Sequence, residues 1–134
     1  GVAIKPGYPV AVGVVEETPV LMLPGNPVAC IVTAQQFLRP ALARAGNIPA
    51  EPVSTQSATL DRKLPSEPGT RTFARVETSA DGDATELTAT PVHTSGAGIL
   101  SSVALADGWV VVPEDREGYS AGETVAVERW GALP

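Results

Sequence analysis

The sequence predicts an α/β portion followed by an all-β, barrel-like portion, with the boundary near residue 52. Three observations support this fold class. Residues 18–45 have the pattern of a short strand, a tight turn and an amphipathic helix. The 134 residues include 13 Gly and 13 Pro but only 4% aromatic residues, which favours many turns and short strands over a helical bundle. From residue 53 onward, β-prone runs follow one another closely with turn residues between them.

The N-terminal portion is predicted to begin with strands. Val2–Ile4 is a short β-prone run, and Pro9–Val15 is apolar on both faces, as in a strand buried inside a layered α/β domain. Glu16–Thr18 is polar and short enough to turn the chain back into Pro19–Leu23. The two apolar runs therefore predict a hairpin.

A helix is predicted over residues 27–45. Asn26 suits its N-cap, and Pro27 suits its first position. Pro40 is expected to kink or shorten the helix, because it lacks an N–H and crowds the carbonyl four residues earlier. Gly46 fits a C-terminal cap.

The second portion is predicted to be a small antiparallel sheet that forms a barrel. Its side chains alternate along the central run, which places one group of residues on a common face: Arg71, Phe73, Arg75 and Glu77. Asp81-Gly82 predicts a hairpin turn, and Ser101–Ala106 predicts one short helical turn. The expected strands are Thr59–Leu64, Thr70–Thr78, Thr85–Thr90, Trp109–Val112 and Thr124–Trp130.

Composition argues against several classes of function. The formal net charge of −6 argues against non-specific nucleic-acid binding, which relies on clustered Lys and Arg. No run of about 18 apolar residues is present, so no membrane span is expected. One Cys cannot form an internal disulfide, which suits a reducing cytoplasm. One His and one Cys cannot build a soft-metal site.

Two places in the N-terminal portion are candidate anion sites. Gly25 and Asn26 lead into a helix start, which presents free N–H groups and the positive end of the helix dipole. The alternative is that this turn only makes a sharp corner. Lys5 precedes Pro6-Gly7, a rigid corner from which its ammonium meets an anion with less backbone entropy to lose. The alternative is an ordinary surface lysine.

The second portion adds Arg75 and Ser101. Arg75 shares a strand face with Phe73, where its guanidinium can bind an oxyanion bidentately. Alternatively, it is a solvated cross-strand partner of a carboxylate. Ser101 and Ser102 lie where a short helix would begin, so either one caps that helix or donates its hydroxyl to an anion.

An ordered set of short motifs resembles the molybdopterin molybdotransferase family, which includes the E domain of gephyrin. The most specific are Lys-Pro-Gly-Tyr-Pro at residues 5–9 and Leu-Pro-Gly-Asn-Pro-Val at residues 23–28. The resemblance extends over nearly the whole chain, through residues 38–42, 71–75, 100–108 and 121–125. It implies that residues 1–52 are the C-terminal part of an α/β molybdopterin-binding domain. Residues 53–134 would then be a β-barrel-like C-terminal domain.

The resemblance also implies site residues. Lys5, Pro6, Arg75 and Ser101 match family positions that bind molybdate. Two features depart from the family pattern. Ala29 stands where many relatives have Ser, so one hydroxyl donor is missing, and the residues before Lys5 include no second basic side chain.

The implied activity is insertion of molybdenum from molybdate into adenylylated molybdopterin, which releases AMP and yields molybdenum cofactor. Mg²⁺ and the pterin nucleotide would be bound mainly outside this chain, in a cytoplasmic homodimer. No nucleic acid or membrane is expected as a partner. The alternative is a non-catalytic, gephyrin-like scaffold or interaction module, because small β-domains commonly bind partners.

Overall fold

The structure, a computed structural model, describes residues 1–80, 82, 85–92 and 106–129. The chain divides into two compact units, Gly1–Pro52 and Val53–Pro134. Within the described residues, none of the helices is both long enough and apolar enough to cross a membrane.

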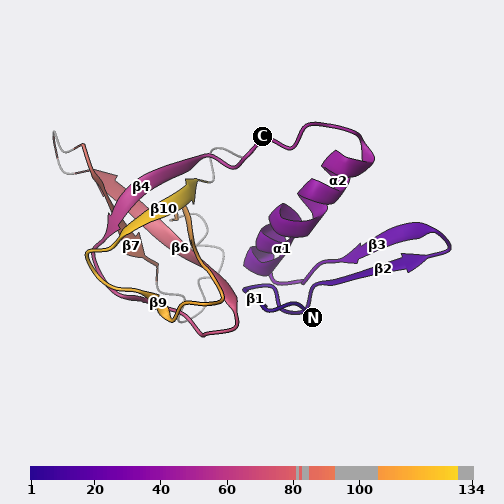
Figure 1. Ribbon diagram of the computed structural model, residues 1–134, viewed down its shortest axis with the longest axis horizontal. Helices are drawn as coiled ribbons and strands as arrows, with labels where there is room; N and C mark the ends of the chain where they lie inside the picture. Colours follow the sequence, from indigo (N-terminus) through magenta and orange to yellow (C-terminus); the bar gives the residue numbers. More distant parts are fainter. Residues whose placement is uncertain (81, 83–84, 93–105, 130–134) are drawn as a thin grey trace. The chain divides into compact units, whose positions relative to one another are not determined.

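The first unit contains the predicted hairpin. A two-residue strand, β1 (Ile4–Lys5), is followed by β2 (Ala11–Val15) and β3 (Thr18–Met22), and the last two pair in antiparallel register (Figure 1). Glu16 and Glu17 make the turn with φ angles of 49° and 65°. Two central residues with positive φ match the twist of the strands on either side, as in type I′ hairpins. The hairpin prediction is confirmed.

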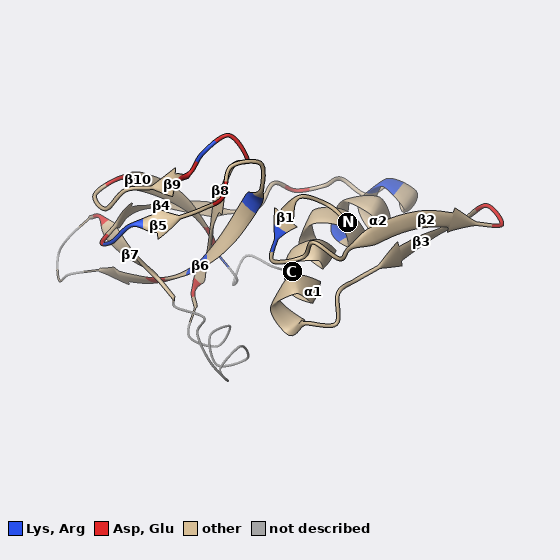
Figure 2. Cartoon of the chain, turned by 90° about the horizontal axis from the view of Figure 1, so that it is seen from below, with Lys and Arg blue, Asp and Glu red and all other residues tan. Residues whose placement is uncertain are grey.

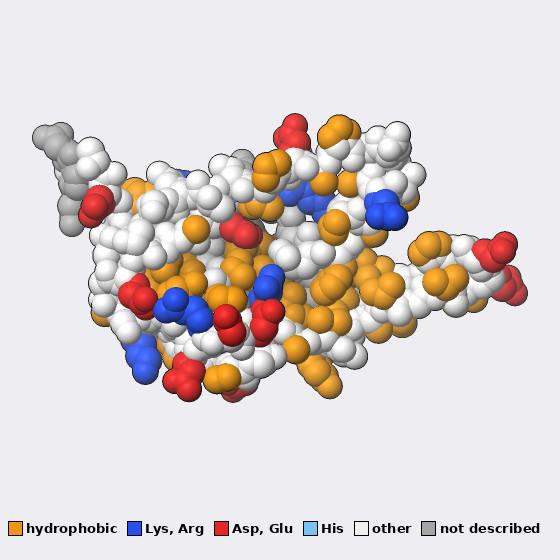
Figure 3. Space-filling view, in the orientation of Figure 1, with side chains coloured by type: hydrophobic (Ala, Val, Ile, Leu, Met, Phe, Trp, Pro, Cys, Tyr) orange, Lys and Arg blue, Asp and Glu red, His pale blue; other side chains and the backbone are white. Residues whose placement is uncertain are grey.

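The prediction that the Pro9–Val15 strand is buried is wrong for the described chain, because most of β2 is exposed. The side chains of Val12, Val14 and Val15 are 61–71% exposed, and Met22 is 52% exposed. In the described residues β2 and β3 pair only with each other, so the ribbon has no third strand. Figure 3 shows its hydrophobic side chains at the surface. Apolar residues on both faces predict burial only if other elements supply it.

The predicted helix forms with a local irregularity. It consists of α1 (Pro27–Thr33), a π-helical segment η1 (Ala34–Leu38) and α2 (Arg39–Ala45). The Arg39 N–H donates to the Ala34 carbonyl, five residues back. This wider turn directly precedes Pro40, whose ring would crowd a regular helical turn. The predicted disturbance at Pro40 is therefore a π-helical segment, and the helix reaches Ala45 with Gly46 as its C-cap.

The second unit is a closed five-stranded sheet, which confirms the predicted β-barrel-like domain (Figure 2). Its strand order is β6-β7-β4-β10-β8, and pairing of β6 with β8 closes it. The strands are β4 (Thr55–Leu60), β6 (Arg71–Ala80), β7 (Leu87–Pro91), β8 (Gly108–Val112) and β10 (Thr124–Arg129). The core consists of Ala58, Leu60, Leu64, Val76, Ala89, Val110, Val112, Val125 and Val127.

Two predictions about these strands were wrong. The first strand is Thr55–Leu60, not Thr59–Leu64, because Ala58 and Leu60 point into the core and the polar residues after them bend away. Leu64 belongs to a separate short strand, β5 (Leu64–Pro65), which pairs with β9 (Gly118–Tyr119). The sheet is also not wholly antiparallel, since β4 and β7 pair in parallel.

The alternation predicted along β6 is confirmed. Val76 is fully buried in the barrel core, and Ala74 packs against that core. Phe73 and Arg75 occupy the opposite face of the strand, hereafter the outer face of the barrel. The alternation therefore turns Ala74 and Val76 toward the core and places Phe73 and Arg75 on the other face of the strand.

Leu60→Ala should destabilise the barrel by about 2–5 kcal/mol, because Leu60 is 1% exposed and its removal leaves a cavity in the core. Leu87→Ala is the comparison, since Leu87 only packs at the margin of the core and should cost less. Both free energies of unfolding can be measured by urea titration of tryptophan fluorescence, because both tryptophans lie in the second unit. Equal losses for the two variants would contradict this account of the core.

Candidate functional site

Lys5 lies on a compact loop of the first unit. It is exposed at the end of β1, and the Lys5–Pro6 peptide bond is cis. Backbone hydrogen bonds close the loop on both sides: the Val2 N–H donates to the Tyr8 carbonyl at 3.1 Å, and the Val10 N–H donates to the Gly7 carbonyl at 3.0 Å. Hydrogen bonds on both sides therefore fix the backbone that carries the Lys5 side chain.

Gly7 anchors this loop to the helix. Its φ of +127° is unfavourable for any residue with a Cβ, and a Cβ placed there would lie 2.6 Å from Cγ2 of Thr33. Thr33 is itself fully buried, and its hydroxyl donates to the Ala29 carbonyl at 2.7 Å. Ala29, the position at which the family commonly has Ser, is 5% exposed and contributes no side-chain donor.

The turn at Gly25 and Asn26 serves the helix itself. The Asn26 side-chain oxygen accepts from the N–H groups of Val28, at 3.1 Å, and Ala29, at 3.4 Å. Two of the N–H groups that an anion would need are thus already occupied by the N-cap. Gly25 does not need to be glycine for steric reasons, because a Cβ there would meet nothing within 4 Å. The geometry favours the structural interpretation of this turn.

Arg75 lies in β6, in the second unit, on the outer face of the barrel. It is half-buried, and this burial lowers the pKa of its guanidinium from an ordinary value that is far above neutral pH. Its cross-strand partner in β8 is Trp109. The rings of Trp109 and Phe73 meet edge to face with centroids 5.5 Å apart. Arg75 therefore stands in a partly desolvated, aromatic setting.

Asp107, the residue before β8, is hydrogen-bonded to β6. Its carboxylate accepts from both the backbone N–H of Thr78, at 2.7 Å, and the Thr78 hydroxyl, at 3.1 Å. Its own N–H donates to the Val76 carbonyl at 3.0 Å. No local spacing in the sequence indicates this structural role, because Thr78 lies 29 residues away from Asp107.

Arg71 shares the strand face of Arg75 but has a different environment. Its Nε donates to Glu114 Oε2 at 3.0 Å, and both side chains are about half exposed. The Glu114 backbone N–H and the Arg71 guanidinium hold the pKa of the Glu114 carboxyl below its ordinary value. No three His, Cys, Asp or Glu side chains gather as a metal site among the described residues.

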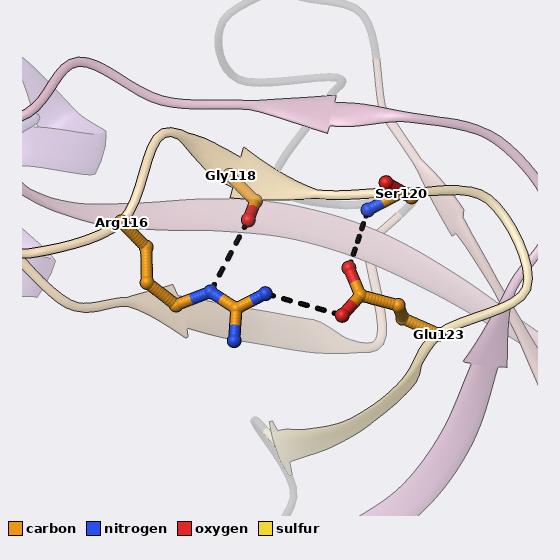
Figure 4. Close-up of polar contacts among 4 residues, drawn as sticks. All are labelled: Arg116, Gly118, Ser120 and Glu123. Carbon is orange, nitrogen blue, oxygen red and sulfur yellow. Dashed lines mark hydrogen bonds and ion pairs between the residues drawn. The ribbon is translucent and has the colours of Figure 1, made fainter.

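The loop between β8 and β10 is held by a polar cluster (Figure 4). Arg116 donates to the Gly118 carbonyl at 3.3 Å and to Glu123 at 3.1 Å, and its guanidinium lies 4.3 Å from the ring centre of Tyr119. The Ser120 N–H donates to the second oxygen of Glu123. Arg116 and Glu123 therefore hold the conformation of this loop.

The sequence-predicted site residues thus fall into three groups. Lys5 and Pro6 belong to the first unit, and Arg75 belongs to the second. Ser101, with Ser102 and the predicted helical turn, lies outside the described residues.

Residues 57–130 match the MoeA C-terminal region (domain IV) family. The chain belongs to the MoeA family. This finding confirms the resemblance drawn from the sequence motifs, and the matched range includes Arg75 and every strand of the closed barrel except the first two residues of β4.

Curated relatives and solved structures extend the similarity over nearly the whole chain. Molybdopterin molybdenumtransferase 2 of Mycobacterium tuberculosis is 36% identical over 126 residues, which cover 94% of this chain and 30% of the relative. Molybdopterin molybdenumtransferase of Haemophilus influenzae is 30% identical over 133 residues, covering 98% and 33%. The crystal structure of the molybdopterin biosynthesis MoeA protein from Pyrococcus horikoshii superimposes with a TM-score of 0.78 at 30% identity, covering 97% and 31%. This chain therefore spans about a third of the length of these MoeA relatives.

Gly7→Ala should destabilise the first unit by about 1–3 kcal/mol, because it forces a positive φ on a residue with a Cβ and drives that Cβ into Thr33. Gly25→Ala is the matched control, since its Cβ meets nothing and its effect should stay within about 0.5 kcal/mol. The comparison can be made by urea unfolding followed by far-ultraviolet circular dichroism. Equal effects of the two substitutions would show that the loop does not depend on Gly7.

Glu123→Gln should lower the thermal midpoint by about 1–5 °C at pH 7. The hydrogen bond from the Ser120 N–H lowers the pKa of the Glu123 carboxyl below its ordinary 4.5. Desolvation raises this pKa in part, and Arg116 lowers it further. A lowered native pKa stabilises the fold above that ordinary value, and the stabilisation is lost as the pH falls through the native pKa. The difference from wild type should therefore shrink below pH 4.5 and vanish in strong acid. Glu117→Gln, an exposed glutamate of the same loop, is the control; a pH-independent difference for Glu123→Gln would refute the linkage.

Proposed function

We propose that this chain is the molybdate-binding part of a molybdopterin molybdotransferase, which inserts molybdenum into adenylylated molybdopterin, releases AMP and forms molybdenum cofactor. The observation that carries this proposal is the match of residues 57–130 to MoeA domain IV, together with relatives named molybdopterin molybdenumtransferase that align with nearly the whole chain. The activity belongs to the longer protein, and the isolated chain should be inactive.

Lys5, Pro6 and Arg75 are the proposed molybdate-binding residues of the described chain. Molybdate is a dianion, and its tetrahedral oxygens suit an ammonium point charge and a planar guanidinium. Partial burial of Arg75 strengthens its attraction for an anion, since a lower local dielectric increases the Coulomb energy. Rigid backbone under Lys5 reduces the entropy lost on binding. Ser101 stays a prediction from the sequence.

The two units take different parts in this proposal. Residues 1–52 are the C-terminal part of an α/β molybdopterin-binding domain, and residues 53–134 are the β-barrel-like C-terminal domain. The exposed apolar ribbon of β2 and β3 supports the first assignment, because such a ribbon is unstable in water without further layers. Segments beyond this chain would bind the pterin nucleotide and Mg²⁺, in a cytoplasmic homodimer.

Arg75→Ala should weaken molybdate binding by the chain at least about tenfold, because a charge-assisted hydrogen bond pair is lost. Arg71→Ala is the matched control on the same strand face, and its effect should stay within about twofold because Arg71 is engaged with Glu114. Amide NMR titration with molybdate, and with sulfate as the reference anion, measures both affinities. Equal effects of the two substitutions, or equal responses to the two anions, would contradict the assignment.

The same substitution separates the enzyme from the scaffold alternative in the complete protein. Under the proposal, Arg75→Ala abolishes molybdate-dependent formation of molybdenum cofactor. A scaffold that acts only by binding partners would keep its function after this change. Full turnover by the Arg75→Ala protein would exclude Arg75 from the molybdate site.

A further inference from the structure

Three side chains form a row across adjacent strands on the outer face of the barrel. Trp109 in β8 is the cross-strand partner of Arg75 in β6 and of Glu128 in β10. Side chains directly opposite each other in antiparallel strands point to the same face, with Cβ atoms about 5 Å apart. Arg75, Trp109 and Glu128 are therefore neighbours in the folded barrel, although 53 residues separate the first from the last by sequence number (128 − 75).

The indole of Trp109 is held on two sides. Its Nε1–H donates to a carboxylate oxygen of Glu128, and its ring meets the ring of Phe73 at an interplanar angle of 82°. Trp109 and Phe73 are each only 4% exposed. A buried indole N–H needs an acceptor, and an edge-to-face ring contact is directional. Glu128 therefore selects one orientation of Trp109.

The backbone brings the carboxylate and the indole together. A Cβ placed at Gly108 would lie only 2.1 Å from the Glu128 carbonyl oxygen, so β8 and β10 approach too closely here for any larger residue. This approach immediately precedes Trp109 and keeps Glu128 in register with it. The pair is thus built into the barrel wall and does not depend on a mobile loop.

An oriented indole limits the positions open to the neighbouring arginine. A long guanidinium side chain has about 2 kcal/mol of rotamer entropy to lose, and binding is stronger when that freedom is already restricted. Arg75 is half-buried, in agreement with a side chain that lies along a neighbour rather than extending into water. The Trp109 ring is the side chain that the register places beside it.

We propose that Glu128, through Trp109, is a positioning residue that orients Arg75 toward an oxyanion. The part of this inference that concerns the anion rests on the proposed function, whereas the orientation of Arg75 does not. Neither Trp109 nor Glu128 needs to touch the anion.

Electrostatics alone predicts the opposite effect of removing Glu128. A carboxylate near a bound anion repels it, so its loss should raise anion affinity if charge were its only contribution. Positioning predicts that affinity falls. Glu77 provides the matched control, because it is an exposed glutamate two residues from Arg75 on the same face of β6.

The first experiment measures Arg75 without any ligand. In ¹⁵N-labelled chain, the order parameter of the Arg75 Nε–H bond should fall below about 0.6, the range of flexible groups, in Glu128→Ala and Trp109→Phe. It should stay at the wild-type value in Glu77→Ala. Glu128→Gln should restore it, since an amide oxygen still accepts the indole N–H. An unchanged order parameter in folded Glu128→Ala and Trp109→Phe would overturn the proposal.

The second experiment repeats the molybdate titration, with sulfate as reference, on the same variants. Glu128→Ala should weaken binding about three- to tenfold with little change in the backbone amide spectrum, Glu128→Gln should lie near wild type, and Glu77→Ala should bind as well as wild type or better. Affinity in Glu128→Ala equal to or above wild type, while Arg75→Ala loses binding, would overturn positioning and keep the proposed function. Unchanged binding in Arg75→Ala would instead overturn the proposed function, and the order parameters would still decide whether Glu128 orients Arg75.

Discussion

Pairing of β6 with β8 is the constraint on which the second unit depends. Without it, β6-β7-β4-β10-β8 would be an open sheet with two exposed edges, and its inward valines would face water. With it, Val76, Val110 and Val112 are enclosed with the other core residues, and the five strands bury a continuous core. The same pairing sets Arg75 opposite Trp109. The contact that closes the barrel therefore also creates the surroundings of the candidate anion-binding arginine.

A comparable constraint operates on a smaller scale in the first unit. Gly7 packs closely on Thr33, so the loop that carries Lys5 is held against α1. Asn26 caps the same segment from the other end. The motifs at residues 5–9 and 23–28, which carry the resemblance in the sequence, are thus explained largely by packing and capping. Gly7 and Asn26 position the backbone, and Lys5 is the residue whose side chain can bind an anion.

The candidate site residues are predictions from the sequence, whereas the residues that support Arg75 carry no sequence signal. Lys5 and Arg75 stand out because a cation beside a rigid turn, or on a strand face with an aromatic neighbour, has a direct interpretation as an anion ligand. Trp109 and Glu128 carry no such signal. They are 19 residues apart, and only the register of β8 against β10 makes them partners. Asp107 is the same case, because its bonds to Thr78 arise from tertiary structure.

By itself, the sequence determined the local structure: the Asn26 N-cap, the hairpin turn at Glu16 and Glu17, and the alternation along β6. Each follows from torsional preferences or a short hydrophobic period, which act over a few residues. Tertiary structure alone decided the parallel pairing of β4 with β7, the separation of Leu64 into its own strand and the exposure of β2. The physical reason is that strand order and burial depend on which distant segment supplies the other half of each hydrogen bond and each apolar contact.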